Sequence, residues 1–202
     1  MQKHQNKSSY NQSSVFQLWK QRIPWLLLLT VSATFTGSVI SHFEGMIGSY
    51  AVLTTFLPML MDTGGNAGAQ TSVTVIRGLS LDEIAPRHLL RVLYKELLIA
   101  LLCGLTLGGV VFVKIMVIDF RLQPVSVLEN GLTQNNLLIA TLVSLTVLGA
   151  VLVAKLVGTL LPITAKKLGV DPAVAASPFV TTVVDTLTLL LYFGLASFFL
   201  EI

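Results

Sequence analysis

The chain has 202 residues, of which 53% are hydrophobic and 11% charged, with a formal net charge of +3 and one cysteine. Soluble domains carry about 25% charged residues, so this composition excludes a soluble enzyme, a disordered protein and a disulfide scaffold. The apolar residues come in blocks of about twenty or more, the length that a helix needs to cross a bilayer, which predicts an integral membrane protein.

Residues 1–22 are expected to form a polar cytoplasmic tail. The segment is rich in Gln, Asn and Ser, and it lacks the apolar core and cleavage site of a signal peptide. Its end, around Phe16 and Trp19, fits either a stretch at the membrane interface or a frayed tail. Residues 23–202 are then expected to form one transmembrane domain.

The predicted fold class is an all-α integral membrane protein with five transmembrane helices. At a rise of about 1.5 Å per residue, each predicted segment is long enough to cross a hydrocarbon core of about 30 Å. The expected spans are residues 24–42, 51–76, 89–117, 137–162 and 172–200.

The basic residues predict the orientation. Most of the 13 Lys and Arg residues fall before the first span, between the second and third, or after the fourth. The positive-inside rule then places the N-terminus in the cytoplasm and the C-terminus outside the cell membrane. The same bias explains the net positive charge without nucleic acid.

The second half of the second span combines small and polar residues. Gly64 and Gly68 form a GxxxG pair, which lets another helix approach closely. Asn66 and Gln70 are one turn apart and add amide oxygens, and Asp62 lies in the same stretch. Helix packing alone is one interpretation, but this density of polar groups indicates a surface covered by protein or water at membrane depth.

The fifth span carries a polar stripe. Ser177, Thr181, Asp185, Thr188 and Tyr192 are spaced so that they share one helical face. A carboxylate in line with hydroxyls inside a span indicates an ion path. The alternative is a Ser/Thr stripe that joins helices, with Asp185 protonated.

Other polar residues are interpreted more simply. Glu44, directly after the first span, is either solvated or placed at a pore mouth, and Lys155 is expected to pair or to extend toward the interface. Asp62-Thr63-Gly64 spells the triad of aspartic proteases, but its helical context does not match that chemistry. The chain is therefore expected not to be an enzyme. No cluster of Cys or His in the sequence invites Zn²⁺ or Cu⁺.

Two long strings resemble the MgtE family of magnesium channels. They are FLPMLMDTGGNAGAQTSVTVIRGLSLDEI in the second span and DPAVAASPFVTTVVDTLTLLLYF in the fifth, and the resemblance runs from about Pro24 to Leu200. It implies a homodimer with five spans per chain and a pore along the dimer axis, lined by spans two and five. Full-length members carry a cytoplasmic Mg²⁺-sensing region before the first span, where this chain has about 22 residues. This indicates an excised membrane domain or a short member.

The resemblance also implies the metal site. Asp185 of both protomers is expected to hold a hydrated Mg²⁺, with help from the Thr181 carbonyl, Asn66 and Ser177. Residues expected to line the pore are Glu44, Asp62, Gly65, Gln70 and Thr188. Mg²⁺ keeps much of its water and binds through few carboxylates, which agrees with one Asp per chain. The residues alone leave Ca²⁺, Mn²⁺ and Co²⁺ open.

The leading functional hypothesis is a Mg²⁺-selective channel in the lipid bilayer that conducts the hydrated ion, without nucleic acid or a soluble substrate as partner. The alternative is a secondary transporter that couples Mg²⁺ to Na⁺ or H⁺, with Asp62 or Asp185 as carrier. A membrane scaffold without transport activity is a third hypothesis, which gives no reason for the polar stripe around Asp185.

Overall fold

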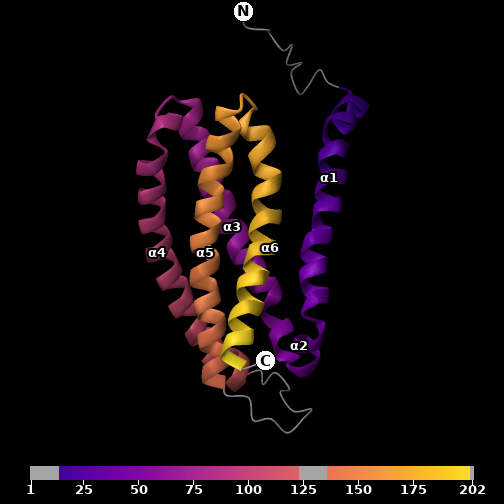
Figure 1. Cartoon of the computed structure of the whole chain (residues 1–202), viewed down its shortest axis with the longest axis vertical. Helices are drawn as coiled ribbons and strands as arrows, with labels where there is room; N and C mark the ends of the chain where they lie inside the picture. The colour runs from indigo at the N-terminus through magenta and orange to yellow at the C-terminus, as the bar shows by residue number, and fades with distance from the viewer. Residues whose placement is uncertain (1–13, 123–135, 201–202) are drawn as a thin grey trace, which may run out of the picture.

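The computed structural model describes residues 14–122 and 136–200, and every long element in this part of the chain is a helix (Figure 1). Residues 1–13 of the predicted tail lie outside the described residues. The elements are α1 Val15–His42, α2 Glu44–Ser49, α3 Val52–Ser80, the 3₁₀ helix η2 Pro86–His88, α4 Leu89–Lys114, the π-helix η3 Ile115–Leu122, α5 Asn136–Lys167 and α6 Pro172–Leu200.

Among the described residues, four segments are long and apolar enough to cross a membrane, as expected for spans one, three, four and five: Val15–His42, Leu89–Phe120, Asn136–Lys167 and Phe179–Leu200. α3 is equally long, with 29 residues, but it is not among them. Its middle carries the Asp, Asn, Gln and Gly residues already noted, which lower its hydropathy. A fifth crossing through α3 is therefore a proposal.

α1 begins at Val15, well before the expected start of the first span. Ser14 caps the helix, because its hydroxyl accepts a hydrogen bond from the Gln17 backbone N–H at 3.3 Å while the Gln17 side chain accepts one from the Ser14 N–H at 3.0 Å. This reciprocal capping box satisfies backbone donors that a helix start leaves unpaired. The last part of the expected tail is thus helical.

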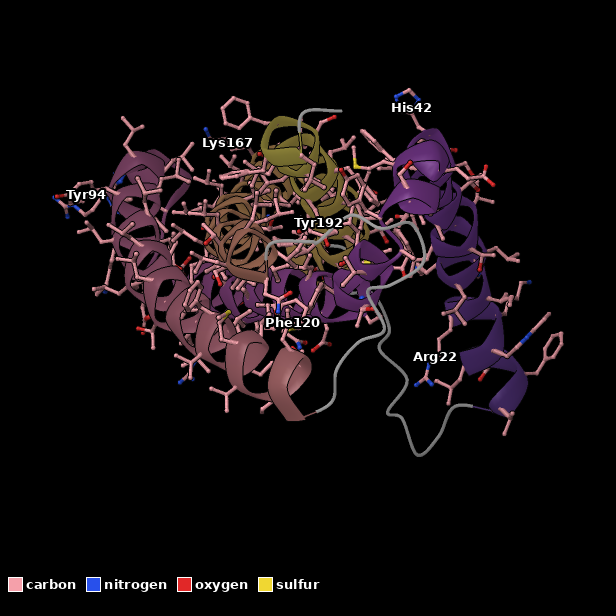
Figure 2. All side chains as sticks on the ribbon, turned by 90° about the horizontal axis from the view of Figure 1, so that it is seen from below. Arg22, His42, Tyr94, Phe120, Lys167 and Tyr192 are labelled. Carbon is pink, nitrogen blue, oxygen red and sulfur yellow. The ribbon has the colours of Figure 1, made fainter. Side chains whose placement is uncertain are left out.

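The five long helices run alternately up and down the bundle (Figure 1). α5 packs against α3, α4 and α6, while α1 packs mainly against α6. In the view along the bundle, Tyr192 of α6 lies in its middle, and Tyr94 and Arg22 lie at its rim (Figure 2). Tyr192 is fully buried, and its hydroxyl donates to the Leu53 carbonyl of α3 at 3.1 Å.

The basic residues used to predict orientation collect at one end of the bundle. This end contains the starts of α1 and α4 and the ends of α3 and α5 (Figure 1). The described basic residues there are Lys20, Arg22, Arg77, Arg87, Arg91, Lys95, Lys166 and Lys167. α2, with Glu44 at its start, lies at the opposite end (Figure 1).

The π-helix η3 continues α4 and brings two charged residues together. Lys114 Nζ lies 3.1 Å and 2.9 Å from the two carboxylate oxygens of Asp119. The backbone hydrogen bonds of a π-helix join residues five apart, which is the spacing of this pair.

Candidate ion-binding site

α3 has two different faces in its middle. Between Leu60 and Val75, every buried residue is small, namely Gly64, Gly65, Gly68, Thr71 and Ser72. The other face is exposed and polar, and it carries the predicted residues Asp62, Asn66 and Gln70. Because these three residues are spaced by four, they follow one another along one side of the helix.

The small residues let α3 approach its neighbours closely. A Cβ atom added to Gly64 would lie 2.8 Å from Thr188 Oγ1 and 3.0 Å from Val184 Cγ1 of α6. A Cβ on Gly158 of α5 would lie 2.5 Å from the Gly68 carbonyl oxygen. The expectation that the GxxxG pair allows a close helix approach is confirmed, and it applies to two partner helices.

Asp185 lies at this contact between α3 and α6. Its Oδ1 would be 3.3 Å from a Cβ on Gly65, and the side chain of Thr181 lies against the same glycine, with Cγ2 at 3.7 Å. Asp185 and Thr181 are both half-buried. Asp62 lies close enough to Asp185 for the two carboxylates to interact electrostatically.

The remaining predicted residues are placed differently. Thr188 is fully buried against Gly64, and its hydroxyl has no hydrogen-bond partner within the described part of the chain. Glu44 is exposed in α2, at the end of the bundle. Ser177 belongs to α6, but its side chain lies outside the described residues.

The site offers oxygen ligands from carboxylates, hydroxyls and amides, which suit a hard divalent cation such as Mg²⁺. Within residues 14–122 and 136–200, no group of three or more His, Cys, Asp or Glu side chains could hold a metal ion.

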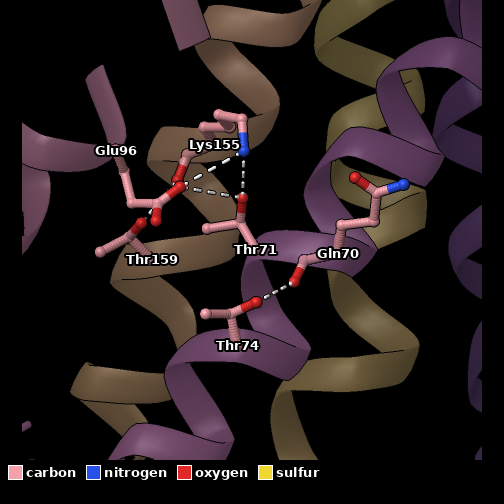
Figure 3. A network of polar contacts seen from close by, with 6 residues as sticks. All are labelled: Gln70, Thr71, Thr74, Glu96, Lys155 and Thr159. Atoms are coloured by element: carbon pink, nitrogen blue, oxygen red, sulfur yellow. Dashed lines mark hydrogen bonds and ion pairs between the residues drawn. The ribbon is translucent and has the colours of Figure 1, made fainter. Parts of the chain in front are cut away.

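A polar network on the buried side of α3 was not predicted from the sequence. Lys155 of α5 pairs with Glu96 of α4 at 3.3 Å and donates a hydrogen bond to the hydroxyl of Thr71 of α3 at 3.0 Å (Figure 3). Pairing was one of the two outcomes expected for Lys155, but its partners were not identified. The sequence did contain a signal for one of these partners, because an acidic residue such as Glu96 is rare within an apolar span.

The comparisons with known proteins all point to one family. The sequence model of MgtE, described as a divalent cation transporter, matches residues 57–195. The chain is 33% identical over 181 residues to the magnesium transporters MgtE of Enterococcus faecalis and Bacillus subtilis, covering 90% of this chain and 37% of each relative. It is 31% identical over 192 residues to that of Thermus thermophilus, covering 95% of this chain and 39% of the relative. The chain thus spans less than two fifths of the length of these curated relatives.

Proposed function

Since the chain belongs to the MgtE family of divalent cation transporters, we propose that it forms a Mg²⁺-selective channel with Asp185 in the ion path. The observation that carries this proposal is the polar, exposed face of α3 beside Asp185 in a bundle of membrane-spanning helices. In a membrane, such a face requires cover by protein or water.

A comparison with α4 supports this use of α3. The exposed residues of α4 include Leu97, Leu98, Leu101 and Leu102, which suit contact with lipid. The middle of α3 instead exposes Asp62, which would be costly against lipid tails. We therefore propose that α3 is a fifth crossing and that its polar face lines an aqueous path.

We further propose that a second copy of the chain completes this path. A twofold axis along the exposed face of α3 would bring two Asp185 carboxylates to one ion and shield both polar faces from lipid. The water molecules bound to Mg²⁺ donate hydrogen bonds, so hydroxyl and amide oxygens can help the carboxylates to hold the ion. In this arrangement Asp185, Thr181, Ser177 and Asn66 hold the ion, while Glu44, Asp62, Gly65, Gln70 and Thr188 line its path.

The grouped basic residues support an orientation in the cell membrane. We propose that the end with Arg77 and Lys166 faces the cytoplasm, as the positive-inside rule requires. The N-terminus is then cytoplasmic, and the C-terminus lies on the other side after five crossings.

A coupled transporter is the second candidate, and the proximity of Asp62 to Asp185 favours it. Two interacting carboxylates can share a proton or a Na⁺ ion as well as a divalent cation. In that case Mg²⁺ movement requires a gradient of the coupling ion.

The experiment that tests the proposal measures Mg²⁺ uptake into proteoliposomes under a K⁺ diffusion potential, without a Na⁺ or H⁺ gradient. We expect voltage-dependent uptake by the unaltered chain and none by Asp185→Ala. Asp119→Asn, which removes a carboxylate charge at the end of the bundle, is the matched control and should retain uptake. Uptake that requires a Na⁺ or H⁺ gradient would establish the coupled transporter, and unchanged uptake by Asp185→Ala would exclude Asp185 from the path.

A further inference from the structure

The network of Lys155, Glu96 and Thr71 joins three helices at one point inside the bundle (Figure 3). The Lys155 ammonium lies 3.0 Å from Thr71 Oγ1 and 3.3 Å from Glu96 Oε2, and the Thr71 hydroxyl donates to the same Glu96 oxygen at 3.3 Å. The side chains of Lys155 and Glu96 are only 10% and 13% exposed, so the protein shields most of the pair from solvent and lipid.

Packing alone does not require charged residues here. Burying an ion pair among helices carries a large desolvation penalty, and apolar residues of similar size often stabilise such a position equally well. Ionisable residues inside a membrane bundle are therefore candidates for a functional role, with the best-attested role of buried pairs being the selection of one helix register.

The surface of α3 explains why its register needs selection. Its buried face is made of small residues from Gly64 to Ser72, and Gly68 meets Gly158 of α5 backbone against backbone. Neither Gly68 nor Gly158 has a side chain that could interlock with the other helix, so this contact with α5 opposes sliding and rotation only weakly. Thr71 is the position in this stretch at which α3 is held by directional contacts to both α4 and α5.

The network also lies close to the candidate ion site along α3. Gln70, the neighbour of Thr71, is exposed on the polar face, and Asn66 lies about one turn before it. A shift of α3 by one residue would rotate both side chains by about 100° around the helix axis. A contact on the buried face of α3 thus determines which side chains lie on its exposed polar face.

We propose that Lys155 and Glu96 are positioning residues that hold α3 in register with α4 and α5, and so keep Gly65 against Asp185 and Asn66 on the exposed polar face. The register itself does not depend on the proposed function. Only its consequence for ion passage rests on that proposal.

A disulfide can measure the register directly. The Cβ of a residue at position 65 would lie 4.0 Å from the Cβ of Thr181, within the usual range for a disulfide. The probe is the double variant Gly65→Cys/Thr181→Cys in a Cys103→Ala background, and the readout is the rate of intrachain cross-linking by a mild oxidant in the bilayer.

The key variant adds Glu96→Leu and Lys155→Met to this probe. Removal of both charges leaves no buried charge unpaired, so we expect this variant to fold with thermal stability close to that of the parent. We expect its cross-linking to be slower by about tenfold, because the directional contacts to Thr71 are lost. Lys155→Met alone should show the same slow cross-linking together with reduced stability.

Lys114→Met is the matched control, because it makes the same substitution in the other ion pair of the described chain. It should cross-link at the parent rate. The proposal is overturned if the folded Glu96→Leu/Lys155→Met variant also cross-links at the parent rate, since the pair would then contribute only to stability.

Mg²⁺ uptake is measured separately on the same charge variants with the native residues at positions 65 and 181. We expect reduced uptake by Glu96→Leu/Lys155→Met. Slow cross-linking with unchanged uptake would overturn the link to ion passage. If the unaltered chain shows no uptake, the proposed function fails while the cross-linking result still decides the register.

Discussion

Gly65 of α3 and Asp185 of α6 face each other across the helix contact, where a Cβ on Gly65 would lie 3.3 Å from Asp185 Oδ1. This distance is shorter than most contacts made by a real Cβ atom. The absence of a side chain at position 65 therefore gives the Asp185 carboxylate its present location.

Replacement of Gly65 by Ala should displace that carboxylate. We expect Mg²⁺ uptake to fall by roughly tenfold, which corresponds to about 1.4 kcal/mol in the free energy of ion binding or passage. Flux into proteoliposomes measures the effect. Gly194→Ala on α6, where a Cβ would have no neighbour within 4 Å, should leave uptake unchanged. Equal uptake by both variants would show that Asp185 adapts without consequence.

The contact between Gly158 and Gly68 should be sensitive to a single methyl group. A Cβ at position 158 would lie 2.5 Å from a backbone oxygen, which cannot move aside like the end of a side chain. We expect Gly158→Ala to lower the free energy of unfolding by about 1–3 kcal/mol. Denaturant unfolding in detergent checks this value.

Gly109→Ala is the control for that measurement, since a Cβ there would have no neighbour within 4 Å. Alanine favours the helical conformation, so stability should stay the same or rise by up to about 1 kcal/mol. A loss of stability at position 109 equal to that at 158 would mean that glycine content, not close packing, matters.

Asn66 should be in contact with water, whereas the natural Cys103 should not. Both residues are exposed in the single chain, but Cys103 lies among exposed leucines of α4. Thiols react as thiolates, which require an aqueous environment. We expect a charged, membrane-impermeant thiol reagent to modify Asn66→Cys but to leave Cys103 unmodified, as measured by mass spectrometry. The proposed aqueous path would be wrong if position 66 stayed unmodified in the folded variant.

Tyr192 should contribute a measurable hydrogen bond to the core. Tyr192→Phe removes the bond to the Leu53 carbonyl without changing the ring, so we expect a loss of roughly 0.6–1 kcal/mol in unfolding free energy. Tyr94→Phe is the control, because Tyr94 is 66% exposed and its change should stay within about 0.5 kcal/mol. Equal losses of unfolding free energy at both positions would show that the hydrogen bond of Tyr192 does not contribute to stability.

The sequence predicted those features that depend on one helix at a time. Apolar length located four of the five expected spans, and the spacing of Asn66 and Gln70 placed these two residues one turn apart. The boundaries were less accurate, because the capping box at Ser14 extends α1 into the expected tail.

Features that join distant segments could not be predicted from one sequence. Glu96 and Lys155 are separated by 59 residues, and no spacing rule connects them. The GxxxG pair predicted a close contact but not that Gly158 would be its partner. Lys114 and Asp119 are five residues apart, which in an α-helix would place them on different sides, and only the π-helix brings them together.

The contact between α1 and α6 has a consequence for biosynthesis. Thr36 of α1 bonds to Thr186 of α6 at 3.1 Å, across 150 residues of sequence. Synthesis proceeds from the N-terminus, so the ribosome completes every other long helix before α1 can meet this partner. Meanwhile, several hydroxyl groups of α1 bond to carbonyls of their own helix, namely those of Thr30, Ser32, Thr34 and Ser38. With these donors already satisfied, α1 can reside in the bilayer as a separate helix until the last one emerges.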